Sequence, residues 1–346
     1  MRVGLDVGST TIKCVVLDDR NNLIYHTYER HYSHIVEKSA ELLRRVAERC
    51  GREAVFAISG SAGMGMAESV KAPFVQEVFA TRVAANRLAP GTDVIIELGG
   101  EDAKILFLTN GLEVRMNGSC AGGTGAFIDQ MATLLKMGAE EMDKAAQTAE
   151  KTYTIAARCG VFAKSDIQPL INQGAKSADI AKSIYQAVVN QTIAGLAQGR
   201  PIKGHVLYLG GPLTFSKCLR QSFDETLGVT GTCPENSLLF VALGAAFYAE
   251  ESWDLLKTAE LLEQRGMSET YRSQPPLFRD QAEYDAFKAR HAKAAVPQAE
   301  FPADYAKPVH IGIDSGSTTV KVTVIDEDAN LLFTDYRPNQ GDPIAL

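Results

Sequence analysis

The chain has 346 residues, 45% of them hydrophobic and 22% charged, an ordinary balance for a globular protein long enough for two or three packed domains. A formal net charge of -7 argues against a surface for nucleic acid or anionic membranes, and no apolar run approaches the roughly 18 residues that a membrane span needs. The N-terminus has no apolar signal core, and six cysteines are too few for a disulfide scaffold. We therefore expect a cytoplasmic protein that binds neither nucleic acid nor membrane.

The first part of the chain predicts strands that enclose glycine-rich turns. A Gly-Ser-Thr-Thr turn separates two short apolar runs, and a similar strand–turn–strand unit follows further on around Leu-Gly-Gly-Glu-Asp. A run with apolar side chains at helical spacing lies between them. The predicted elements are strands at 2–7, 12–18, 23–28 and 55–59, a helix at 35–50, and the second strand–turn–strand unit at 93–108.

The rest of the chain is mostly helical in pattern up to about residue 250. A glycine turn, Asn-Gly-Ser-Cys-Ala-Gly-Gly-Thr-Gly, opens a helix that carries apolar residues on one side. Further helices are expected at 159–172, 178–198 and 237–250, and a strand at 205–210 that ends in Gly-Gly-Pro. Between 252 and 307 charge and proline rise, which predicts one amphipathic helix and an extended linker.

A repeat links the two ends of the chain. Residues 3–23 align without a gap with residues 311–331, and Gly, Asp, Gly-Ser-Thr-Thr and Lys stay in register. A hairpin alone cannot bury its apolar face. We therefore interpret the chain as the N-terminal part of a longer protein with a second, truncated copy, and expect residues 309–346 to be disordered or packed opportunistically.

The first glycine turn has the chemistry of a phosphate-binding loop. Phosphates need backbone N–H donors at close range, and a glycine such as Gly8 allows the tight turn that gathers them. The hydroxyl groups of Ser9, Thr10 and Thr11 add donors, and Lys13 can add a charge. Asp6 ends the strand before the turn, where a carboxylate can hold a hydrated Mg²⁺.

The second unit repeats this design, and a third glycine pair follows a strand. The three segments, in the order acid–glycine hairpin, acid–glycine hairpin and strand–Gly–Gly, predict an ATP or ADP site more specifically than any one of them. Asp6, Glu97 and Glu101 are the candidate catalytic residues. The further candidate nucleotide-binding residues are Gly99, Gly100, Asp102, Gly123, Thr124, Gly210, Gly211 and Pro212.

This ordered set resembles the superfamily of actin, Hsp70 chaperones and sugar kinases over roughly residues 1–250. The resemblance implies an α/β fold with two ribonuclease-H-like domains that close on ATP in the cleft between them. It places lobe I at 1–92, with 237–250 packing back on it, and lobe II at 93–236. A helix and linker at 251–308 and the start of a second repeat at 309–346 complete the expected domains.

Two cysteines lie in glycine-rich segments that precede predicted helices. Cys120 and Cys159 have small neighbours, and a helix N-terminus lowers the pKa of a thiol and so favours the thiolate that binds metal. Two thiolates are too few for a cuboidal iron–sulfur cluster, but a symmetric dimer would supply four. The remaining cysteines are interpreted as small buried hydrophobic residues: Cys14, Cys50, Cys218 and Cys233.

The segments CAGGTGAFIDQMA and CGVFAKSDI are similar to matching segments of the activator proteins of 2-hydroxyacyl-CoA dehydratases, relatives of the ATPase subunits of benzoyl-CoA reductase. The resemblance implies a four-iron four-sulfur cluster held by Cys120 and Cys159 of two protomers, or of two tandem modules. It also implies ATP hydrolysis that drives one low-potential electron from a ferredoxin or flavodoxin to an acyl-CoA dehydratase or reductase. The repeat at 309–331 resembles the large tandem members.

Two departures from that family pattern and one rival function are notable. The family usually has Asp at the position of Glu97 and Gln at that of Glu101, so the sequence predicts slower or altered ATP turnover. The rival is an amino-sugar type kinase of the same superfamily, which would need no cysteine pair, and a non-catalytic ATP-dependent switch is a third option. His26, His31 and His34 form a loose cluster with a spacing that suits a metal, but a solvated surface is the interpretation that we favour.

Overall fold

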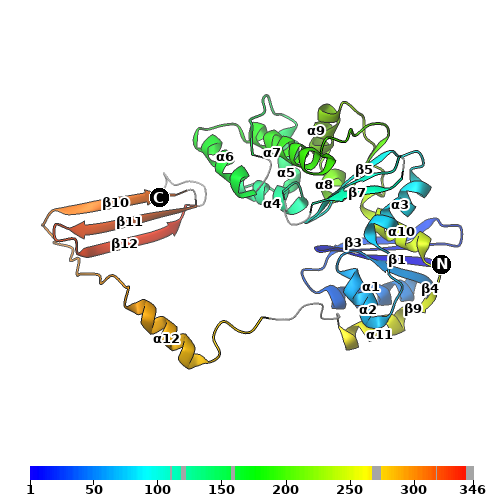
Figure 1. Ribbon diagram of the computed structural model, residues 1–346, viewed down its shortest axis with the longest axis horizontal. Coiled ribbons are helices and arrows are strands. Elements are labelled where there is room, and N and C mark those ends of the chain that lie inside the picture. Colours follow the sequence, from blue (N-terminus) through cyan, green and yellow to red (C-terminus); the bar gives the residue numbers. More distant parts are fainter. Residues whose placement is uncertain (110, 118–121, 157–159, 267–273, 317, 340–346) are drawn as a thin grey trace. The chain divides into compact units, whose positions relative to one another are not determined.

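The computed structural model describes residues 1–109, 111–117, 122–156, 160–266, 274–316 and 318–339 (Figure 1). The chain divides into two compact units, Met1–Thr270 and Tyr271–Leu346. The first unit contains two lobes, each built on its own mixed sheet (Figure 1).

Lobe I has the strand order β3-β2-β1-β4-β9. Its strands are β1 (Arg2–Val7), β2 (Thr11–Leu17), β3 (Leu23–Arg30), β4 (Glu53–Ser59) and β9 (Ser252–Asp254). β1 pairs antiparallel with β2 and parallel with β4. Helices α1 (Ile35–Cys50), α2 (Gly63–Val70) and α11 (Leu255–Arg265) cover one face of the sheet, where the apolar side chains of alternate strand positions form a buried core.

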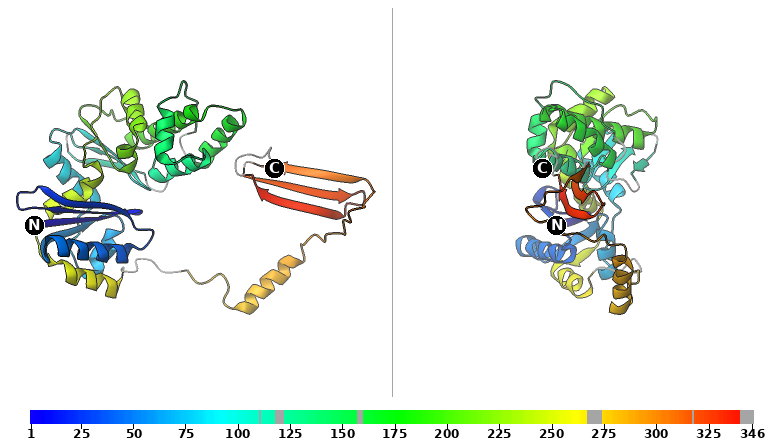
Figure 2. Two further views of the ribbon diagram at one scale, coloured as in Figure 1. Left: turned by 180° about the vertical axis from the view of Figure 1, so that it is seen from behind. Right: turned by 90° about the vertical axis from the view of Figure 1, so that its left-hand side faces the viewer.

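Lobe II repeats this pattern with the strand order β7-β6-β5-β8. Its strands are β5 (Val94–Leu98), β6 (Ala103–Phe107), β7 (Glu113–Met116) and β8 (Val206–Leu209). β5 pairs antiparallel with β6 and parallel with β8, as β1 does with β2 and β4. Helices cover one face of the sheet, as the view from behind in Figure 2 also shows. They are α4 (Gly125–Leu134), α5 (Ala139–Ala146), α6 (Gly160–Asn172), α7 (Ser177–Thr192) with the π-helical turn η1 (Ile193–Ala197), α8 (Gly211–Phe215) and α9 (Lys217–Leu227).

Two helices lie between the sheets and connect the lobes. α3 (Glu77–Leu88) leads from lobe I to β5, and α10 (Phe240–Tyr248), preceded by the 3₁₀ turn η2 (Ser237–Leu239), leads back. Their shared core takes side chains from both sheets. The two helices touch so closely at Gly244 that any Cβ there would collide with the carbonyl group of Ala80. This contact explains why a small-residue helix occupies the predicted range 237–250.

The second unit contains helix α12 (Gln281–Ala292) and a sheet of the order β10-β11-β12. β10 (Val309–Ser315), β11 (Thr319–Asp326) and β12 (Leu331–Pro338) pair antiparallel throughout. The register shift at Val324 matches the shift at Val16 in lobe I, so the structure repeats β1–β3 down to this irregularity. Asp326, the last residue of β11, accepts a hydrogen bond from the N–H of Asn330, as Asp18 accepts one from the N–H of Asn22.

Most predicted elements of residues 1–250 are confirmed within a few residues, but two expectations for the last hundred residues are wrong. The described residues of 252–307 include the strand β9 and two helices, α11 and α12. α11 is not part of a linker, because its Leu255, Ala259 and Leu262 pack into the lobe I core. Residues 309–316 and 318–338 form an ordered sheet, because a third strand equivalent to β3 extends the predicted hairpin.

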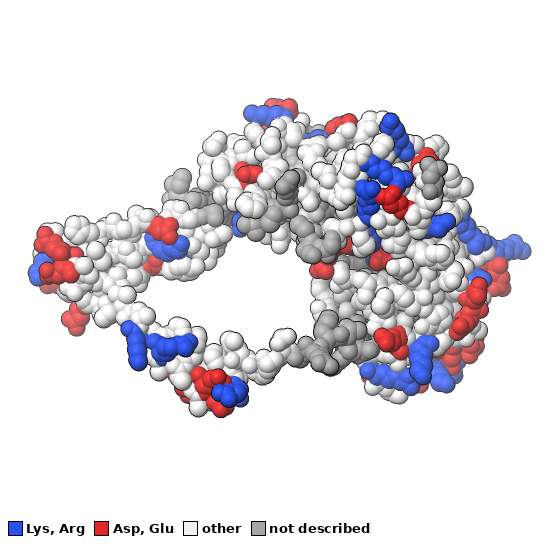
Figure 3. All heavy atoms as spheres, viewed as in Figure 1, with Lys and Arg blue, Asp and Glu red and all other residues white. Residues whose placement is uncertain are grey.

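The surface mixes charges of both signs. Figure 3 shows Lys and Arg interspersed with Asp and Glu over the visible face of the first unit, in keeping with the modest net charge of -7. Among the described residues, no helix is both long enough and apolar enough to cross a lipid bilayer.

Candidate functional site

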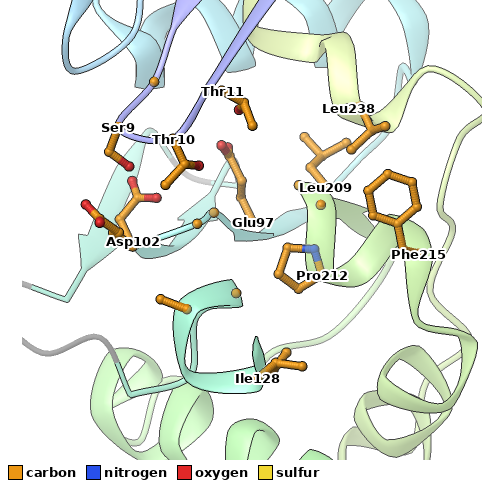
Figure 4. Close-up of a pocket in the computed structure, with 18 of the residues that line it drawn as sticks. Ser9, Thr10, Thr11, Glu97, Asp102, Ile128, Leu209, Pro212, Phe215 and Leu238 are labelled. Atoms are coloured by element: carbon orange, nitrogen blue, oxygen red, sulfur yellow. The ribbon is translucent and has the colours of Figure 1, made fainter. Parts of the chain in front are cut away.

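A cavity of about 930 Å³ opens between the two lobes. It is lined by the turns of both glycine hairpins, by the segment after β8, and by the start of α4. Figure 4 shows its division: Ser9, Thr10, Glu97 and Asp102 gather at one end, and Pro212, Phe215 and Leu238 at the other. A polar end beside an apolar end suits a ligand with a charged tail and a flat apolar head.

The first hairpin places its predicted residues at the polar end. The N–H of Gly8 donates to the carbonyl of Thr11 (3.0 Å), which closes the turn between β1 and β2. The register pairs Asp6 with Lys13, and Lys13 Nζ lies 3.0 Å from Asp6 Oδ2. Burial alone would lower the pKa of Lys13, but the Asp6 carboxylate raises it above the usual value. Lys13 therefore enters the cavity as a cation.

The second hairpin has the same geometry with different side chains. The N–H of Gly99 donates to the carbonyl of Asp102 (2.8 Å), and the register pairs Glu97 with Lys104, as Asp6 pairs with Lys13. The two turns face each other closely, because a Cβ on Gly100 would lie 2.6 Å from Thr10 Oγ1. Any larger residue there would have to displace the Thr10 side chain of the first loop.

The third glycine segment also lies where the sequence predicts. Gly210, Gly211 and Pro212 follow β8 and line the cavity. Gly210 has a φ of +87°, and a Cβ would collide with the carbonyl of Leu98 on the neighbouring strand. Glycine is thus required for the chain to turn from β8 into α8 beside the second hairpin.

An acidic residue that sequence reasoning missed completes the polar end. Glu77, the first residue of α3, accepts a hydrogen bond from Lys104 Nζ (2.5 Å). Lys104 also lies 2.6 Å from Asp102 and 3.6 Å from Glu97. Burial raises the pKa of Glu77, Lys104 lowers it, and the negative charges of Glu97 and Asp6 raise it further, to about 7. Four carboxyl groups thus contact two lysines, which favours binding of a further cation: Asp6, Glu77, Glu97 and Asp102 against Lys13 and Lys104.

The apolar end is formed by residues of both lobes. Tyr28 of β3 and Phe215 of α8 meet edge to face with ring centroids 6.2 Å apart. A Cβ on Gly211 would lie 3.5 Å from the Tyr28 hydroxyl oxygen. Leu238 and Val241, at the start of the segment that returns to lobe I, also line the cavity. None of these side chains carries a sequence motif, so single-sequence reasoning had no signal for them.

Several candidate residues lie elsewhere or outside the described part of the chain. Gly123 and Thr124 do not line the cavity; the next two residues, Gly125 and Ala126, do. Thr124 is instead buried as the residue before α4. Cys120 and Cys159 lie outside the described residues. Glu101, by contrast, lines the cavity and is exposed.

The interpretation of the histidines as a solvated surface is wrong for one of them. His26 and His34 are exposed, but only 4% of His31 is accessible, because the chain after β3 folds its ring under the first glycine turn. Of the cysteines interpreted as small buried residues, Cys14 and Cys218 are buried and Cys50 and Cys233 partly so. Burial raises the pKa of Cys14 to about 12, so it remains a thiol.

Comparison with known proteins agrees with this arrangement. The (R)-2-hydroxyglutaryl-CoA dehydratase activating ATPase of Acidaminococcus fermentans is 28% identical over 252 residues, which cover 71% of this chain and 96% of the relative. The crystal structure of component A of the dehydratase from the same organism matches with a TM-score of 0.66 at 27% identity, covering 75% of this chain and 98% of that one. A second match is the structure of the activator of the 2-hydroxyisocaproyl-CoA dehydratase from Clostridium difficile, solved with bound ADPNP. It has a TM-score of 0.63 at 24% identity and covers 80% of this chain and 99% of that one.

These matches confirm the predicted α/β fold of the actin, Hsp70 and sugar-kinase superfamily, with its two ribonuclease-H-like domains. The model of the BadF/BadG/BcrA/BcrD ATPase family matches residues 3–249. This range covers the two lobes except β9 and α11, and it ends before the second unit. The chain therefore belongs to the BadF/BadG/BcrA/BcrD ATPase family.

Proposed function

We propose that this protein is an ATP-hydrolysing activator that delivers a low-potential electron to a 2-hydroxyacyl-CoA dehydratase or a benzoyl-CoA-reductase-like partner. The relative from Acidaminococcus fermentans is named as a dehydratase-activating ATPase, which supports the ATPase and activator parts of the proposal. The observation that carries the coupling between ATP and electron transfer is a pair of hydrogen bonds between the second glycine hairpin and helix α4.

The polar end of the cavity suits the phosphates of Mg-ATP. Proteins hold Mg²⁺ through one or two carboxylates, with water and substrate phosphates as the other ligands. Asp6 and Glu97 are buried at equivalent strand positions. Together with Glu77 they carry more negative charge than the positive charge of Lys13 and Lys104 neutralises. Asp6 and Glu97 would hold the ion, which would neutralise charge on the phosphates.

The coupling rests on helix α4, which begins five residues after Cys120. The N–H of Gly125 donates to the carbonyl of Gly99 (2.9 Å), and the N–H of Ala126 donates to that of Gly100 (2.8 Å). Any shift of the Gly99–Gly100 turn on loss of the γ-phosphate would therefore move the start of α4. α3 and α10, the helices that connect the lobes, would accommodate the accompanying change of angle.

The cysteine donor set fits a cluster shared between two protomers. Gly160, next to Cys159 in the chain, lies against Phe127 and Gln130 of α4, so the segments that follow the two cysteines are neighbours. Cys120 and Cys159, which lie outside the described residues, are the candidate ligands that the likeness to the activators implies, two from each protomer of a dimer. A bound four-iron cluster would supply one-electron redox chemistry at low potential.

Anoxic purification tests the proposal. We expect a brown protein with about four irons per dimer. Replacement of Cys120 or Cys159 by Ala should abolish the iron, whereas the matched control Cys233→Ala, at a partly buried cysteine outside this pair, should keep it. Mg-ATP and Mg-ADP should give different cluster spectra, potentials or partner affinity.

Two results would contradict the proposal in different ways. A colourless protein that transfers phosphate to a sugar would select the kinase alternative instead. A brown protein with identical cluster properties in both nucleotide states would keep the iron site but refute the coupling through α4.

A further inference from the structure

A buried histidine holds the carbonyl group of the first phosphate loop. His31 Nε2 lies 3.1 Å from the carbonyl oxygen of Gly8. The N–H of Ser33 donates to His31 Nδ1 (3.1 Å), so Nδ1 carries no proton in the neutral ring. The proton is then on Nε2, which donates to Gly8. The backbone N–H of His31 also reaches the carbonyl of Thr10 (3.3 Å), so this residue contacts the turn twice.

This bond controls the direction of a neighbouring donor. In a trans peptide the C=O of one residue and the N–H of the next point in opposite directions. Fixing the Gly8 carbonyl toward His31 therefore directs the Ser9 N–H away from it. Gly8, Ser9 and Thr10 are among the described residues that line the cavity and His31 is not, so the bond is made from behind the loop.

The second unit makes the same contact with a different side chain. Its glycine turn closes through a bond from the N–H of Gly316 to the carbonyl of Thr319 (2.9 Å). Asn339, the equivalent of His31 in the repeat, donates its Nδ2–H to the carbonyl of Gly316 (2.8 Å) and is 4% accessible. Its N–H donates to the carbonyl of Thr318 (2.9 Å), as that of His31 does to Thr10.

Lobe II satisfies the equivalent carbonyl in a third way. There the carbonyl of Gly99 accepts from the backbone N–H of Gly125. Imidazole, amide and backbone donors thus satisfy the equivalent carbonyl of the three glycine turns in the described part of the chain. What the turns share is a donor to this carbonyl, and the group that supplies it varies.

We infer that His31 is a positioning residue for the nucleotide: its Nε2–H holds the Gly8 carbonyl so that the Ser9 N–H stays directed at the phosphates. This role rests on the proposed nucleotide site and adds to it a residue that does not touch the ligand. It also explains why a histidine is buried beneath a loop of small polar residues.

Two substitutions of His31 with side chains of similar shape distinguish the effect of its hydrogen bond to Gly8 from the effect of its packing. His31→Asn keeps a donor of the kind that Asn339 uses, whereas His31→Leu has nearly the same shape as Asn but no donor. Affinity for Mg-ADPNP is measured by isothermal titration calorimetry on the full chain, with circular dichroism to verify folding. We expect His31→Asn to bind within about twofold of wild type and His31→Leu about tenfold more weakly, the effect of one hydrogen bond.

Each other outcome overturns a defined part of this inference. Equal affinity of wild type and folded His31→Leu overturns the positioning role. Folded His31→Asn that binds more than about fivefold more weakly than wild type overturns it as well, even where His31→Leu does not fold. A wild-type chain that does not bind Mg-ADPNP overturns the proposed nucleotide site and the role of His31 with it.

Discussion

Replacing Glu77 by Gln tests whether the polar end of the cavity holds unneutralised negative charge. Glu77 faces Lys104, but burial and the nearby carboxylates of Glu97 and Asp6 raise its pKa to about 7, from an ordinary value of 4.5. Gln has the shape of the protonated acid and carries no charge. The substitution therefore removes the titration while leaving the volume of the side chain in place.

The direction of the effect follows from the raised pKa. Below pH 4.5 the carboxyl group is protonated in the folded and the unfolded chain, and its contribution to stability is fully present. As the pH rises through about 7, the unfolded chain has already released the proton that the folded chain retains, so stability is lost. At about 1.4 kcal/mol for each unit of pKa, the total loss is about 3 kcal/mol, and most of it falls between about pH 5 and pH 8.

The assay is urea unfolding at about pH 5 and about pH 8, without Mg²⁺ or nucleotide. Trp253 is the single tryptophan of the chain, and β9 places it opposite Ala54 of β4, so its fluorescence reports on the first unit. Between about pH 5 and pH 8 the free energy of unfolding of the wild type should fall by about 2 kcal/mol or more relative to that of Glu77→Gln. The control Glu48→Gln, at an exposed position of α1, should keep the pH dependence of wild type.

The result that would refute this reasoning is a free energy of unfolding with the same pH dependence in wild type and Glu77→Gln, within about 0.5 kcal/mol. In that case Lys104 alone would neutralise Glu77, and the site would hold no excess negative charge for a cation.

Two further predictions concern close contacts of glycine. Gly100→Ala places a Cβ 2.6 Å from Thr10 Oγ1 and should displace this phosphate-loop side chain, lowering the affinity for Mg-ADPNP about tenfold or more in calorimetry. Gly138→Ala, where a Cβ meets open space, is the control, and equal affinity of both variants would contradict the facing loops. Gly244→Ala drives a Cβ into the Ala80 carbonyl between α10 and α3, and should cost about 1–3 kcal/mol of unfolding free energy. Gly195→Ala meets only an ordinary contact with Gln191, so a similar loss in both variants would mean that the α3–α10 contact carries no special constraint.

Much of the site could be predicted because its loops are built from local sequence. The turn at Gly8 needs glycine and hydroxyl residues within four positions, and the strands on either side show alternating apolar residues. The same holds for the turn at Gly99 and for the segment at Gly210. Each of these segments lines the cavity as the order of the three motifs implies.

Other site residues could not be predicted, because contacts between segments far apart in the sequence bring them to the cavity. Glu77 begins a helix with no motif of its own, and it reaches Lys104 only because α3 crosses between the sheets. Gly125 and Ala126, rather than Gly123 and Thr124, face the cavity because α4 begins against the second hairpin. Sequence spacing cannot determine which residues of a glycine-rich run meet a surface formed elsewhere in the chain.

The sequence by itself determined the glycine hairpins, their acid–lysine register and their recurrence near the C-terminus, since these depend on turn chemistry and on the two-residue period of a strand. Only the tertiary structure decided which donor meets the glycine carbonyl of each hairpin: His31 at Gly8, Asn339 at Gly316 and the start of α4 at Gly99. A carbonyl in a turn accepts any donor that packing brings to it, so its partner depends on the fold and not on a motif.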